Sequence, residues 1–148
     1  MKSIQFLQAL FTIHSNNFRM LHWKACGENF DSAHSIAGDY YDMVGADIDD
    51  IAEVMLRDDI NPLTLEECLD AKHDMNISIL DVKGDADYTK SEIIRFSGRI
   101  LSDILNGILE TLEDYQDDRH VGIKSYLEGL YDKYDKEANY LNKRRMKR

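Results

Sequence analysis

Long helical patterns with few interruptions dominate this chain. One proline and eight glycines occur among 148 residues, so few positions break a helix. Apolar side chains recur in long stretches at the three- to four-residue spacing of a helix. The alternation typical of half-buried strands is scarce. We therefore expect a single all-α domain.

The connections between the expected helices differ in length. Residues 27–29 form a tight turn, whereas the segment from Leu63 to Gly84 is long enough to contain structure of its own. Two short connections make two antiparallel hairpins, and the long one lets the second and third helices run parallel. This is the ferritin-like form of the four-helix bundle. The four expected helices run from Ile4 to Cys26, from a cap at Asp31 or Ser32 to before Pro62, from Thr89 to about Leu112, and from Asp118 to Asn142.

Two capping boxes mark helix starts. Thr89 and Glu92 have the spacing in which each side chain bonds the other's backbone N–H, and they predict the start of the third helix. Thr64 and Glu67 predict a short helix over residues 64–71 inside the long connection. The fold expected is therefore a four-helix bundle with a short helix in its crossover.

Composition favours a cytoplasmic globular protein. The chain is 43% hydrophobic and 31% charged, and no apolar run approaches the roughly 20 residues that cross a bilayer. The first residues lack a signal-peptide pattern. The two cysteines, Cys26 and Cys68, are too few for a disulfide framework and lack zinc-finger spacing, so we expect reduced thiols.

The charge is unevenly distributed. The net charge is −10, but the last six residues read KRRMKR, and without their five cations the balance is 13 basic against 28 acidic residues. We therefore separate a bundle domain, residues 1–142, from a basic tail, residues 143–148. The tail can contact DNA phosphates, which the acidic body opposes. It can equally be a solubilising end that suits a helix C-terminus. Its cations are Lys143, Arg144, Arg145, Lys147 and Arg148.

Two histidines and two carboxylates have the side chains of a metal site. His22 and His34 lie six residues on either side of Glu28, the centre of the first turn. Equidistant residues of a helical hairpin come opposite each other, so the two histidines can approach within one chain. Asp49 and Glu53, at i and i+4, share one helix face.

These two pairs cannot meet within one molecule. His34 and Asp49 are 15 residues apart on one expected helix, which places them about 22 Å apart along its axis. One possibility is that the two pairs are unrelated, the histidines being ordinary surface or core residues and the carboxylates part of a solvated acidic face. The other is that a second copy of the chain completes one metal site. Two copies packed about a two-fold axis, with these helices antiparallel, would form two such sites. Iron, zinc or manganese suits the ligand set.

The region from Leu21 to Met55 resembles the signature of the Dps family, the mini-ferritins or DNA-binding proteins from starved cells. That pattern has a His-Trp pair, a Gly-x-Asn-Phe turn, a second histidine, and Asp-x-x-Ala-Glu. Here these positions are His22, Trp23, Gly27, Asn29, Phe30, His34, Asp49, Ala52 and Glu53. The likeness extends more weakly over the whole chain.

The resemblance implies a hollow dodecamer with ferroxidase sites at its two-fold interfaces. It implies that His22 and His34 of one chain, with Asp49 and Glu53 of another, bind Fe(II), which is oxidised by hydrogen peroxide and stored as ferric mineral. It also implies that Trp23 quenches radicals near the iron. Packing at the interface is an alternative role for this tryptophan.

The chain departs from the family pattern at two places. Gly38 stands where the family has an aspartate four residues after the second histidine, and Asp42, one turn further, is the carboxylate nearest in line. We therefore expect the second iron position to be weaker, or to be completed by water or by Asp42. Many relatives have a lysine-rich extension before the first helix, where this sequence offers only Lys2, so we expect any DNA contact to fall to the C-terminal cations.

Three functions follow as alternatives. The first is an iron-oxidising storage shell that detoxifies iron and peroxide. The second is a shell that oxidises iron poorly and binds DNA or another partner, a reading that Gly38 motivates. The third keeps the fold but gives zinc or manganese a structural role at the dimer interface.

Overall fold

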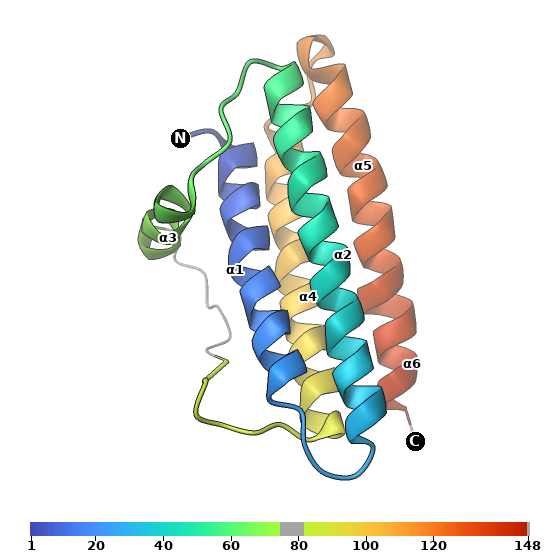
Figure 1. The fold of residues 1–148 in the computed structure, drawn as a ribbon. Coiled ribbons are helices and arrows are strands. Elements are labelled where there is room, and N and C mark those ends of the chain that lie inside the picture. Colours follow the sequence, from blue (N-terminus) through green and yellow to red (C-terminus); the bar gives the residue numbers. More distant parts are fainter. Residues whose placement is uncertain (75–81, 148) are drawn as a thin grey trace.

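The computed structural model describes residues 1–74 and 82–147, and its regular elements there are helices. They are α1 (Ser3–Trp23), α2 (Phe30–Arg57), α3 (Leu65–Asp74), α4 (Lys90–Glu113), the 3-10 turn η1 (Asp118–His120), α5 (Val121–Lys136), the π-helical segment η2 (Glu137–Leu141) and α6 (Asn142–Met146). Four long rods pack side by side, and α2 and α4 run in the same direction (Figure 1). The predicted four-helix bundle with parallel second and third helices is confirmed.

The short helix predicted in the crossover is also present. As Figure 1 shows, α3 lies outside the bundle against α1. Its buried residues Cys68 and Ala71 pack on Ala9 of α1, which fixes the connection to the bundle. The expected connection also includes residues 75–81, which lie outside the described residues.

Both predicted capping boxes are formed. Thr89 Oγ1 accepts from the Glu92 N–H at 3.3 Å, and the Thr89 N–H donates to Glu92 Oε1 at 3.2 Å. Thr64 and Glu67 make the same pair of bonds, at 3.2 and 3.0 Å. These reciprocal bonds satisfy N–H groups that a helix start leaves without partners.

The predicted start of α2 is wrong. The helix begins at Phe30, directly after Asn29, which has a left-handed backbone (φ 62°) and no side-chain capping bond. Neither Asp31 nor Ser32 caps it, and the Ser32 hydroxyl donates instead to the Asn29 carbonyl at 3.0 Å. The left-handed backbone of Asn29 reverses the chain direction immediately before Phe30. The helix α2 therefore begins earlier than the side-chain capping pattern indicates.

The C-terminal helix is more segmented than expected. The predicted single helix from Asp118 to Asn142 consists of η1, α5 and the wider π-helical turn η2, and α6 then continues it to Met146. The helical stretch therefore ends at Met146, beyond the expected end at Asn142. Arg145 reaches back to the bundle, where its guanidinium donates to Tyr40 Oη at 2.7 Å and lies 5.6 Å from the ring centroid.

One apolar core joins the four long helices, and buried polar side chains bond across it. His14 of α1 is 1% exposed and bonds Asp103 of α4 at 2.7 Å. Asp47 of α2 is 4% exposed and bonds two side chains of α5. Within residues 1–74 and 82–147, no helix is long and apolar enough to cross a membrane.

Candidate metal centre

His22 and His34 form a reciprocal clasp. Their rings stack with centroids 3.6 Å apart and planes inclined by 20°. His22 Nδ1 lies 2.7 Å from the backbone carbonyl oxygen of His34, and His34 Nδ1 lies 2.8 Å from that of His22. The predicted approach of these two residues within one chain is therefore confirmed.

The clasp determines which ring nitrogen can bind a metal. A carbonyl oxygen only accepts hydrogen bonds, so each Nδ1 must carry the proton and donate it. In a neutral imidazole the proton is then absent from Nε2, which keeps its lone pair. A backbone carbonyl bonded to Nδ1 is a common way of holding a metal-ligating histidine in position. Both rings thus have the tautomer and the fixed orientation that a ligand needs.

The turn between α1 and α2 brings the two rings together. Gly27 (φ 84°) and Asn29 (φ 62°) adopt the left-handed conformation that a tight reversal requires. Backbone bonds then tie this turn to the segment before α4. The Cys26 N–H donates to the Tyr88 carbonyl at 2.9 Å, and the Tyr88 N–H donates to that of Lys24 at 2.8 Å. The two histidines therefore lie on a helical hairpin whose turn is held in place by backbone hydrogen bonds to the segment before α4.

Two exposed aromatic residues are neighbours of the clasp, Phe30 in space and Trp23 in sequence. Phe30 stacks on His34 at 5.3 Å and is 41% exposed. Trp23 follows His22 and is 60% exposed, with the Arg19 guanidinium 5.2 Å from its ring centroid. Exposed aromatic groups beside a polar cluster are typical of surfaces that another protein covers.

The candidate carboxylates lie away from the histidines. Asp49 and Glu53 are exposed on α2, and so is Asp42. Since α2 is one continuous helix from Phe30 to Arg57, Asp49 stays about 22 Å along the axis from His34. Across the described part of the chain, no three histidine, cysteine or acidic side chains gather closely enough to hold a metal ion. The structure thus joins the two histidines, and leaves the carboxylates apart from them.

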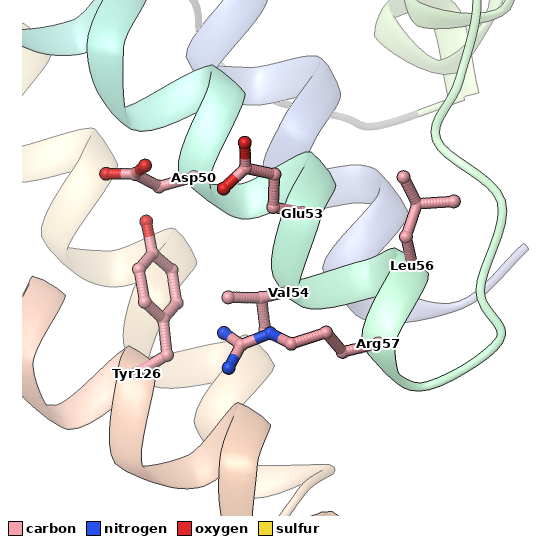
Figure 2. A pocket seen from close by; sticks show the side chains of 6 residues that line it. All are labelled: Asp50, Glu53, Val54, Leu56, Arg57 and Tyr126. Carbon is pink, nitrogen blue, oxygen red and sulfur yellow. The ribbon is translucent and has the colours of Figure 1, made fainter.

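Glu53 borders an open pocket between α2 and α5 (Figure 2). The Tyr126 hydroxyl points toward Asp50, and Arg57 closes one side. Burial, together with the Asp47 and Asp50 carboxylates, raises the pKa of Tyr126, so the phenol keeps its proton. The Tyr126 oxygen is buried without a hydrogen-bond partner among the described residues. Asp50 and Tyr126 were missed by sequence reasoning, although Asp50 belongs to the same acidic run as Asp49.

A second histidine–carboxylate pair was also missed. His120 Nδ1 lies 2.9 Å from Asp58 Oδ2, so the start of α5 is fastened to the end of α2. This pairing is not visible in the sequence, because 62 residues separate the two side chains. Asp117, the residue before η1, accepts a bond from the Arg119 N–H at 3.0 Å.

The basic residues near the C-terminus extend a surface of the folded domain. Lys143 lines a groove together with Arg95 and Arg99 of α4. Arg144 and Lys147 are exposed, and Arg148 lies outside the described residues. Lys143, Arg95 and Arg99 thus form a short cationic strip on the folded surface.

Comparison with known proteins gives matches at the level of structure. No protein-family model matches the chain, and no curated protein sequence matches it. Solved structures do. Dps from Staphylococcus aureus superposes with a TM-score of 0.83 at 20% identity, over 99% of this chain and 93% of that one.

Two further solved structures agree. A Vibrio cholerae DPS protein, described as a member of a broad superfamily of ferritin-like diiron-carboxylate proteins, gives a TM-score of 0.82 at 18% identity, over 98% of this chain and 87% of that one. Dps from Listeria innocua, soaked with cobalt, gives 0.78 at 20% identity, over 93% and 87%. The chain therefore has the fold of the Dps proteins, a ferritin-like four-helix bundle with a short helix in its long connection.

Proposed function

We propose that this chain is the subunit of a Dps-like shell that oxidises Fe(II) and stores the ferric product. The observation that carries the proposal is the clasp of His22 and His34, two imidazoles held in the tautomer that leaves Nε2 available. The superposition of solved Dps structures on nearly the whole chain also supports the proposal. Imidazole with carboxylate is a ligand set that iron accepts.

A second copy of the chain supplies the carboxylates. Asp49 and Glu53 lie on the same rigid helix as His34 but several turns away, so a partner's α2 must run antiparallel to bring its carboxylates to the clasp. A two-fold axis then makes two equivalent sites. Exposed Trp23 and Phe30 beside the clasp support a protein partner there. Six such dimers would make the dodecamer implied by the resemblance.

The reaction needs little from the protein beyond binding and orientation. Two Fe(II) ions each lose one electron, and hydrogen peroxide takes both electrons and two protons to give two water molecules. The histidines and carboxylates hold the substrate ions, and carboxylates also favour the more highly charged Fe(III) product. Trp23, the residue after His22, would donate an electron to stray radicals. Asp42 or water would complete the second iron position.

The direct test is anaerobic loading with Fe(II) followed by hydrogen peroxide. Fast formation of Fe(III), followed by absorbance, and co-elution of that iron with a large assembly on size exclusion are expected. The control is a variant that combines His34→Ala with Glu53→Ala, and it should oxidise Fe(II) no faster than buffer does. Equal rates for the two proteins would refute the proposal.

A second candidate function draws on the cationic strip. Lys143, Arg95 and Arg99 share one groove, which would place phosphate contacts on the folded surface as well as in the tail. A shell with slow iron oxidation and salt-sensitive DNA binding would favour this reading. Zinc or manganese in protein purified without added iron would favour a structural metal at the dimer interface.

A further inference from the structure

Gly38 lies one helical turn after His34, directly beneath the ring of His22. A Cβ atom built on Gly38 would lie 2.8 Å from Nδ1 and 2.9 Å from Cε1 of His22. Real Cβ atoms essentially never approach other heavy atoms this closely. The imidazole therefore occupies the space that any side chain at position 38 would need.

The ring of His22 cannot give way without loss. Its Nδ1 is bonded to the His34 carbonyl at 2.7 Å, and its face is stacked on the His34 ring at 3.6 Å. A shift large enough to admit a Cβ atom would lengthen the bond or break the stack. Loss of the bond would release the tautomer, and loss of the stack would release the direction of Nε2. The close approach at Gly38 is thus part of the clasp.

We infer that Gly38 is a positioning residue for the metal centre, because the absence of a side chain seats the His22 imidazole against α2. This role explains why Gly38 stands in the interior of α2, where helix propensity disfavours glycine. It also accounts for the missing aspartate of the Dps pattern, since that carboxylate and this placement of His22 exclude each other. The use of the seat in metal binding rests on the proposed function.

The first test is Co²⁺ affinity, measured by absorbance titration of the assembled protein. Gly38→Ala should weaken Co²⁺ binding by about 10-fold or more, as loss of a ligand's supporting contacts typically does. Gly45→Ala is the matched control. Gly45 lies on the same helix with nothing within 4 Å of the added Cβ, so its Co²⁺ affinity should stay within about 2-fold of wild type. Equal affinities for the two variants would overturn the inference.

A double-mutant cycle separates positioning from a general effect on folding. If Gly38 acts through His22, then Gly38→Ala should weaken Co²⁺ binding in the wild-type background and change it little in a His22→Ala background. The same loss in both backgrounds would show that the glycine serves only the stability of α2. Gly38→Asp should also weaken binding although it adds a carboxylate, and a gain in affinity would contradict the inference.

A crystal structure of the metal-free Gly38→Ala variant gives a readout that does not depend on metal. The expected result is a displaced His22 ring without its bond to the His34 carbonyl. An unmoved ring would overturn the inference. If wild type and His22→Ala bind Co²⁺ equally, the proposed function fails instead, and the crystal structure still decides whether Gly38 seats the ring.

Discussion

Replacing His34 with asparagine is expected to lower the rate of peroxide-driven Fe(II) oxidation by on the order of 100-fold or more. The substitution removes Nε2, the ligand atom, and leaves a short side chain whose amide N–H can still donate to the His22 carbonyl. In the native chain, the His22 carbonyl oxygen accepts this bond from His34 Nδ1 at 2.8 Å. The fold should therefore survive while the iron site does not. Stopped-flow absorbance of Fe(III) formation measures the rate.

His73→Asn is the matched control for this experiment. His73 is exposed on α3, away from the hairpin that holds the clasp. Its replacement should leave the rate within about 2-fold of wild type, as expected for a surface change distant from the site. Comparable rates for His34→Asn and His73→Asn, with both proteins folded and assembled, would remove His34 from the mechanism.

Replacing Asp47 with alanine is expected to reduce the free energy of unfolding by about 2–3 kcal/mol. The carboxylate is 4% exposed and accepts from the Tyr134 hydroxyl at 2.6 Å and from Lys133 Nζ at 2.9 Å. Lys133 is part-exposed and can turn to water, but the Tyr134 hydroxyl stays buried without an acceptor. Urea denaturation at a fixed protein concentration measures the loss, since assembly shifts apparent stability.

Asp50→Ala provides the comparison on the same helix. Asp50 is exposed, and its loss should change the free energy of unfolding by no more than about 0.5 kcal/mol, as is usual for surface substitutions. Tyr134→Phe should cost less than Asp47→Ala, because it removes the buried hydroxyl and leaves Asp47 bonded to Lys133. A loss for Asp47→Ala as small as that for Asp50→Ala would show that the buried network adds no stability.

Local chemistry made much of the fold predictable. The capping boxes at Thr89 and Thr64 depend on residues three apart, and both are present in the structure. The meeting of His22 and His34 was predictable because a tight turn puts equidistant helix positions opposite each other. Each of these predictions requires only contacts between residues that are close in sequence or that face each other across one tight turn of the chain.

Contacts between distant segments were not predictable in the same way. The bond from His120 to Asp58 depends on how α5 packs on α2. The fit of the His22 ring at Gly38 depends on how closely α1 approaches α2, since an added Cβ would lie 2.8 Å from His22 Nδ1. Its one visible signal was a glycine that helix propensity does not explain, one turn after a candidate ligand. The start of α2 at Phe30 depended on the left-handed backbone of Asn29, which the side-chain capping pattern does not report.

Complementation between two inactive variants tests the two-chain site most directly. One variant carries His34→Asn and the other Glu53→Ala, and each is expected to be inactive when assembled alone. In a mixed dimer, one of the two sites takes His34 and Glu53 from unaltered positions, so it is intact. Random mixing in equal amounts makes about half of the dimers mixed, which restores about one quarter of the wild-type activity. Recovery near that level is the predicted result. Activity no higher than the sum of the separate variants would show that each site draws its ligands from a single chain, or does not use them.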